Sequence, residues 1–78
     1  MKWYIIEFEP FDYLLGKHYL GYYNNSFVLV PKSAAKLFSE DAILNDIKLK
    51  TYLNNQTYRL IKPKKIYDIM KYRYQGSH

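Results

Sequence analysis

Three prolines divide this chain into short extended segments. Pro10, Pro31 and Pro63 each follow a run that is rich in β-branched and aromatic residues. Such residues favour strands, and a proline ends a strand because it has no N–H to donate to the ladder. The sequence therefore predicts several short strands that end at these prolines.

The first strand is predicted over residues 2–9, where side chains alternate between two faces. One face carries Tyr4, Ile6 and Phe8, and the other carries Trp3, Ile5 and Glu7. Because both faces are largely apolar, we expect this strand to be central in the sheet. Residues 11–16 then form a connector with apolar anchors.

Two further strands are predicted over residues 17–23 and 26–30. The intervening Asn24 and Asn25 tolerate the left-handed backbone that a two-residue turn needs, so this pair predicts a β-hairpin. Gly21 in the first of these strands is a candidate for a bulge.

Helices are predicted after the hairpin. Ser33 can cap a short helix that runs through Phe38, and Ser39 can cap a main helix over residues 40–53, with acids in its first turn. This helix has one apolar stripe and a second apolar pair on a different face: Ile43, Leu44 and Ile47 form the stripe, and Leu49 and Leu53 form the pair.

A fourth strand is predicted over residues 57–62, and a short basic helix over residues 64–74. The fold class is thus α+β, with a small antiparallel sheet of three to four strands packed on one main helix and a short basic helix at the C-terminus. A single domain is expected over residues 1–74. Residues 75–78 have the composition of a linker and tag remnant.

Composition excludes several kinds of chemistry. The 78 residues include no cysteine and two histidines, one of them at the C-terminus, so neither disulfides nor a zinc centre is expected and no cofactor is predicted. No segment has the length and hydropathy of a signal peptide or membrane span. We expect a cytoplasmic protein that is stabilised by packing.

The net charge of +5 arises near the C-terminus. Six of the twelve basic residues lie from Arg59 onward with one acid, Asp68, whereas the rest of the chain has six of each sign. The basic side chains are Arg59, Lys62, Lys64, Lys65, Lys71 and Arg73, interleaved with tyrosines. They predict a surface for nucleic acid or for an acidic protein, with an ordinary solvated helix face as the alternative.

Tyrosine is the most informative aromatic residue here, since the chain has ten. A core this small cannot cover them all, and tyrosine is enriched in protein interfaces. The tyrosines predicted to be exposed and to bind a partner are Tyr19, Tyr22, Tyr23, Tyr72 and Tyr74. A hydrophobic edge strand in the hairpin would also allow a homodimer.

Catalysis is not expected. His18 could pair with Asp12 or Glu9 as an acid–base couple, but an isolated histidine in a strand is more often a surface residue. A third hypothesis is a small toxin ribonuclease that works without histidine. Its candidate residues are Arg59, Lys62, Lys64, Arg73 and Tyr74, whose spacing does not separate catalysis from binding.

The succession of segments resembles small phage and mobile-element proteins. The similarity rests on Phe27-Val-Leu-Val30, on Ala35-Lys-Leu-Phe-Ser39 with Ala42, and on Thr57-Tyr-Arg-Leu-Ile-Lys62. It implies a non-enzymatic protein that binds and inhibits a host or antiviral factor, with anti-CRISPR proteins as the functional analogue. The alternative is a basic accessory protein that binds DNA or RNA through its C-terminal segment.

Overall fold

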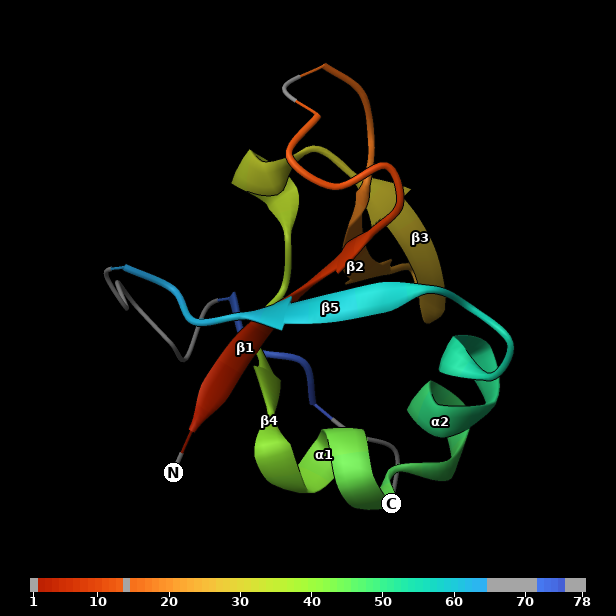
Figure 1. Ribbon diagram of the computed structural model, residues 1–78. Helices are drawn as coiled ribbons and strands as arrows, with labels where there is room; N and C mark the ends of the chain where they lie inside the picture. The colour runs from red at the N-terminus through yellow and green to blue at the C-terminus, as the bar shows by residue number, and fades with distance from the viewer. Residues whose placement is uncertain (1, 14, 65–71, 76–78) are drawn as a thin grey trace.

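The computed structural model describes residues 2–13, 15–64 and 72–75. Along the chain it contains β1 (Trp3–Phe8), β2 (Tyr19–Tyr23), β3 (Ser26–Val30), a 3-10 turn (Lys32–Ala34), β4 (Phe38–Ser39), α1 (Glu40–Asn45), α2 (Ile47–Leu53) and β5 (Tyr58–Ile61) (Figure 1). The described residues form a five-stranded antiparallel sheet and two α-helices. The predicted α+β class is therefore confirmed.

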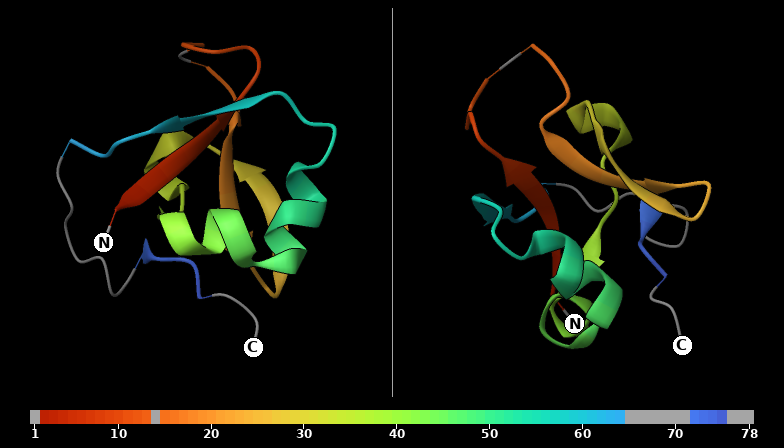
Figure 2. Two further views of the ribbon diagram at one scale, coloured as in Figure 1. Left: turned by 60° about the horizontal axis from the view of Figure 1, so that its bottom comes forward. Right: turned by 90° about the vertical axis from the view of Figure 1, so that its right-hand side faces the viewer.

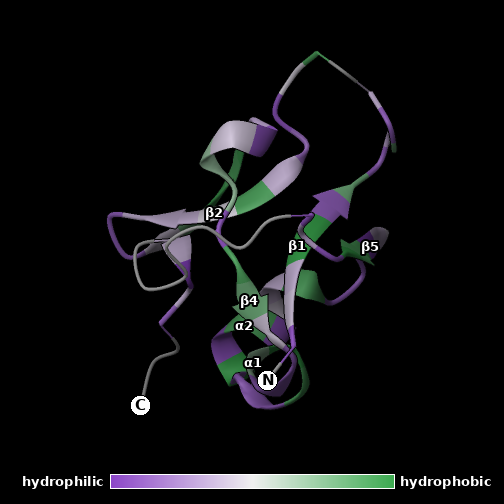
Figure 3. Ribbon diagram, turned by 90° about the vertical axis from the view of Figure 1, so that its left-hand side faces the viewer, coloured by the Kyte–Doolittle hydropathy of each residue, from purple (hydrophilic) through white to green (hydrophobic). Residues whose placement is uncertain are grey.

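Strand β1 is the centre of the sheet, as its two apolar faces predict. The strand order is β3-β2-β1-β4, and β5 also pairs with β1. The start of β1 pairs with β4 through Trp3 and Ser39, while its end lies between β2 and β5. Figure 3 shows hydrophobic parts of β1, β4 and β5 close together in the middle of the molecule.

The hairpin forms as predicted. Asn24 and Asn25 have φ values of 54° and 62°, the left-handed conformation of a tight turn, and Tyr23 pairs with Ser26 across it. No bulge occurs at Gly21, which pairs regularly with Val28. Glycine is needed there for space, because a Cβ would lie 2.8 Å from a ring carbon of Tyr23.

The predicted helix from Ser33 through Phe38 is wrong beyond the 3-10 turn. Leu37 and Phe38 are extended instead, because other segments supply their backbone hydrogen bonds. The Leu37 N–H donates to the Tyr72 carbonyl, and the Leu37 carbonyl accepts from the Tyr74 N–H. Phe38 pairs with Tyr4 and is fully buried, which makes β4 a fifth strand that the sequence did not predict.

The predicted main helix begins where expected but is two helices. Ser39 Oγ accepts from the Ala42 N–H at 3.0 Å, which confirms the predicted cap. The backbone leaves the helical conformation at Asp46 (φ −76°, ψ 113°), whose side chain then caps α2 by accepting from the Leu49 N–H. The expected packing of the sheet on one continuous helix is thereby corrected.

This break also changes which helical residues face the core. Leu49 and Leu53 are buried, whereas two members of the predicted stripe, Leu44 and Ile47, are 60% and 81% exposed. The prediction assumed one helical phase from residue 40 to 53, and the extended residue Asp46 resets that phase. Figure 2 shows α1 and α2 on one side of the sheet.

The core is small and aromatic. Its buried members are Ile6, Phe8, Leu20, Phe38, Leu49, Leu53 and Tyr74. The Phe27 ring packs against this group, with its centroid 5.3 Å from Tyr52 and 5.4 Å from Tyr74. Edge-to-face and tilted aromatic pairs of this kind add specific attraction to the burial of apolar area.

The predicted basic helix over residues 64–74 falls mostly on residues 65–71, which lie outside the described residues. Within the described part, Arg73 forms an isolated parallel bridge with Leu37. Residues 76–78 of the predicted tag remnant also lie outside.

Candidate functional site

A row of side chains crosses the face of the sheet that lies opposite the Ile6 and Phe8 side chains. The strand register places Val30 opposite Tyr19, Tyr19 opposite Glu7, and Glu7 opposite Arg59. Directly opposed residues in antiparallel strands project to the same face. Four strands thus contribute one residue each to a continuous row.

Glu7 is the polar centre of this row and is 1% exposed. Its carboxylate accepts hydrogen bonds from the Asp12 N–H, the Tyr19 hydroxyl and Arg59 Nε, the last at 2.6 Å. Burial by itself would raise the pKa of Glu7, but these three donors and the Arg59 charge outweigh it and hold that pKa below its usual value. Burial and the neighbouring Glu7 carboxylate raise the pKa of Tyr19.

The loop between β1 and β2 closes over this row. Arg59 makes a second ion pair with Asp12, and its guanidinium lies 4.8 Å from the centroid of the Phe11 ring. Hydrogen bonds to both carboxylates raise the pKa of Arg59 further above its usual value. Arg59 therefore holds the loop to the sheet.

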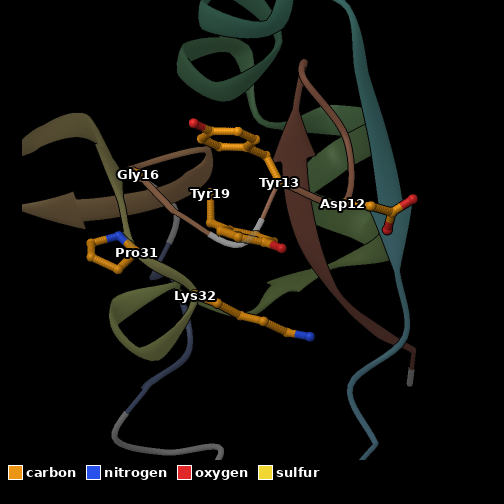
Figure 4. Close-up of a pocket in the computed structure, with 6 residues that line it drawn as sticks. All are labelled: Asp12, Tyr13, Gly16, Tyr19, Pro31 and Lys32. Atoms are coloured by element: carbon orange, nitrogen blue, oxygen red, sulfur yellow. The ribbon is translucent and has the colours of Figure 1, made fainter.

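A pocket of about 250 Å³ lies beside this loop. It is lined by Asp12, Tyr13, Gly16, Tyr19, Pro31 and Lys32. In Figure 4 the rings of Tyr13 and Tyr19 lie one above the other, and the polar ends of Tyr19 and Lys32 point the same way. Its two charged lining residues, Asp12 and Lys32, have opposite signs, so the pocket has no net charge with which to select an ion.

One of the two carboxylates proposed to pair with His18 is engaged elsewhere. The His18 ring meets the Tyr13 ring edge-on at a centroid distance of 5.3 Å, and Asp12 pairs with Arg59 instead. Within residues 2–13, 15–64 and 72–75, no three His, Cys, Asp or Glu side chains come together as metal ligands. In the same part of the chain, no helix is long and apolar enough to cross a membrane.

Strand β3 offers a different kind of site, because it lies at the edge of the sheet (Figure 1). In a hairpin with a two-residue turn, the residues that flank the turn exchange hydrogen bonds, and every second pair after them does the same. Ser26, Val28 and Val30 therefore bond to β2. The Leu20 carbonyl accepts from the Lys36 N–H, away from β3, which agrees with this pattern.

The backbone groups of Phe27 and Leu29 consequently point outward. No described residue bonds to their N–H groups. Two apolar side chains accompany them, since Val28 is 36% exposed and Leu29 is 43% exposed. Residues 26–30 contain no charge and no proline, which are the devices that normally protect an edge.

Strand β5 provides a comparison, because its outer edge also has no partner among the described residues. Leu60 there is 41% exposed, much like Leu29. However, Arg59 lies within β5, and Lys62, Pro63 and Lys64 follow it directly. Pro31 and Lys32 follow β3 in the same way, so the difference is the charge that β5 carries within the strand. Charge within a strand discourages pairing, which leaves β3 as the more open edge.

The hairpin segment itself carries charge of one sign. Residues 17–38 contain Lys17, Lys32 and Lys36 and no acid. Lys48 joins them from α2, where its Nζ bonds to the Tyr22 hydroxyl and the Asn25 carbonyl. In the described part of the chain the ion pairs all involve Arg59, so none of these lysines is neutralised by a carboxylate.

The predicted partner-binding tyrosines do not form one exposed surface. Tyr74 is 5% exposed and donates its hydroxyl hydrogen bond to Asp46, so the prediction that Tyr74 is exposed was wrong. Tyr22 is partly buried against the core, and Tyr19 is partly buried over Glu7. Tyr23 is 37% exposed on the hairpin, while its hydroxyl donates to the Ala34 carbonyl. Tyr72 is half-buried beside Leu37.

The residues predicted to form a basic surface do not all lie free on the surface. Arg59 is committed to Glu7 and Asp12 and is not available as a free cation, because the register of β5 places it opposite Glu7. Lys62 and Lys64 are exposed, and Arg73 is half-buried with an Nε that has no hydrogen-bond partner among the described residues. Lys65 and Lys71 lie outside the described residues.

The sequence analysis did not single out the two residues that define the open edge, Val28 and Leu29. Their signal was present, namely an uncharged strand between a tight turn and a proline. Nothing in the sequence located the edge, however, because that depends on which strands pair. No family model, curated protein or solved structure matches this chain.

Proposed function

We propose that this chain is a non-enzymatic binding protein that pairs the outer edge of β3 with an extended segment of a partner protein. The observation that carries the proposal is the unprotected edge, with outward backbone groups at Phe27 and Leu29 and exposed side chains at Val28 and Leu29. Strand addition obtains affinity from backbone hydrogen bonds and specificity from alternate side chains.

The partner segment should be acidic. Residues 17–38 carry three lysines without an acid, so a negatively charged segment is attracted to this edge and a basic one is repelled. Inhibition of a host or antiviral complex is the role that the resemblance implies, and strand addition would serve it by occupying a surface that the complex needs. Binding to DNA or RNA through Lys62 and Lys64 is the alternative.

A displayed library of random peptides tests the proposal. Selection on the purified protein should enrich acidic peptides with alternating apolar residues, and their binding should shift the backbone amide signals of Phe27 and Leu29. Leu29→Pro removes an outward N–H without breaking the hairpin ladder, and should weaken binding about ten-fold or more because one or two backbone bonds are lost.

Leu60→Pro is the matched control, since Leu60 is similarly exposed and also directs its N–H outward. The bond from the Glu9 N–H to the Thr57 carbonyl, just before β5, sets the pattern in which Arg59 and Ile61 are the β5 residues that bond to β1. Peptides that bind Leu29→Pro as well as the wild type, or that lose affinity with Leu60→Pro instead, would overturn the proposal.

A further inference from the structure

The open edge of β3 is complementary to itself. Consider two copies that pair their β3 strands antiparallel, with a two-fold axis beside Val28. Phe27 of each copy then lies opposite Leu29 of the other, and these are the residues whose N–H and C=O groups point outward. Each copy would donate two hydrogen bonds and accept two, without any change in the hairpin.

The side chains fit the same arrangement. Val28, 36% exposed, would meet its own counterpart across the axis at a non-hydrogen-bonded position, where opposed side chains approach most closely. Leu29, 43% exposed, would be covered by the partner copy's strand on the other face. No like charges would face each other within the paired segments, because residues 26–30 are uncharged.

We infer that the free chain forms a weak two-fold dimer through β3, centred on Val28, and that this dimer covers the edge until an acidic partner segment replaces it. The second half of the inference rests on the proposed function, whereas the first half does not. Isologous pairing of this type closes after two copies, because each copy contributes the same strand.

Charge makes the dimer weak and replaceable. Residues 17–38, which include the paired strand, carry Lys17, Lys32 and Lys36 and no acid in each copy. Salt screens this repulsion, so the dimer should become tighter as the salt concentration rises. An acidic segment experiences the opposite effect, and its binding should weaken with salt. The two occupants of the edge are therefore distinguished by the sign of their salt dependence.

Single cysteines test the arrangement cleanly, because the chain contains no cysteine. In the inferred register the two Val28 Cα atoms are about 4.5 Å apart, within the range that a disulfide spans. Val28→Cys should therefore form a covalent dimer in a glutathione redox buffer. Leu29→Cys is the control, since the two Leu29 positions lie diagonally opposed and too far apart, and Leu60→Cys tests the β5 edge.

Sedimentation velocity over a wide concentration range completes the experiment. The wild type should shift from monomer toward dimer, more so at high salt, whereas Val28→Lys and Leu29→Pro should stay monomeric. Val28→Lys places like charges opposite one another and leaves the backbone groups intact, so it separates lost pairing from lost folding. A wild type that stays monomeric, or cross-linking of Leu29→Cys or Leu60→Cys as efficient as that of Val28→Cys, would overturn the dimer.

The same variants separate this inference from the proposed function. The oxidised Val28→Cys dimer should lose affinity for the selected acidic peptides, while reduced Val28→Cys should keep it. If the covalent dimer still binds the peptides, self-pairing through β3 is supported, but the claim that peptides bind the same β3 edge is refuted. Peptide binding to a wild type that is strictly monomeric would support the proposed function and refute the dimer.

Discussion

The hydroxyl of Tyr74 donates a hydrogen bond to Oδ2 of Asp46 at 3.0 Å, and Oδ1 of the same carboxylate caps α2 through the Leu49 N–H. One carboxylate thus joins the end of the described chain to the break between the two helices. Tyr74 is held there by its ring, which lies 4.9 Å from Tyr22 and 5.1 Å from Phe38, centroid to centroid.

This relationship predicts coupled losses of stability. Asp46→Ala should lower the free energy of unfolding by about 1 to 2 kcal/mol, because the α2 cap and the Tyr74 bond are both lost. Tyr74→Phe should cost about 1 kcal/mol. Urea denaturation of the single and double variants measures the coupling, and strictly additive losses would show that the bond contributes nothing.

The lowered pKa of Glu7 predicts how the free energy of unfolding depends on pH. Its pKa in the folded protein is depressed, so its stabilising contribution is present above its ordinary value near 4.5 and disappears as the pH falls through the lower folded value. Glu7→Gln should be less stable at neutral pH, by about 1 to 3 kcal/mol for the disrupted buried network.

The difference in stability between Glu7→Gln and the wild type should narrow as the pH falls below 4.5, the ordinary value for a glutamate, toward the lower pKa of Glu7 in the folded protein. Denaturant titrations at several pH values measure it, with Glu9→Gln as the control because Glu9 is exposed. A gap between the two proteins that is constant from neutral to acid pH would contradict the prediction.

Gly21 predicts a steric effect. A Cβ there would lie 2.8 Å from a Tyr23 ring carbon and 3.0 Å from Val30 Cγ1, closer than normal contact. Gly21→Ala should therefore lower the free energy of unfolding by about 1 to 3 kcal/mol. The double variant Gly21→Ala with Tyr23→Ser should recover part of this loss. If Gly21→Ala melts at the temperature of the wild type, the close packing over Gly21 is refuted.

The nucleic-acid alternative has its own prediction. Under the proposed function, changing Lys62 and Lys64 to Glu should leave acidic-peptide binding nearly unchanged, since both residues follow β5 and lie away from the β3 edge. Binding of single- and double-stranded DNA and RNA across a salt series gives the comparison. Tight binding that falls steeply with salt and disappears in this double variant would favour the alternative.

Local features of the fold were predictable from the sequence because they depend on neighbouring residues. The Asn24-Asn25 turn, the Ser39 cap and the alternation of β1 each arise from the backbone preferences or spacing of a few consecutive positions. The prediction failed where distant segments decide the conformation. Leu37 is extended because residues 72–74 pair with it, and a local helix signal could not reveal that pairing.

The same division applies to the candidate site. The sequence by itself determined that residues 26–30 form an uncharged strand between a tight turn and a proline, within a stretch whose only charges are positive. Tertiary structure decided that this strand lies at the edge, that Arg59 forms ion pairs with Glu7 and Asp12, and that Tyr74 is buried. The physical reason is that strand propensity is a property of adjacent residues, whereas exposure and ion pairing depend on which strands, far apart in the chain, share one sheet.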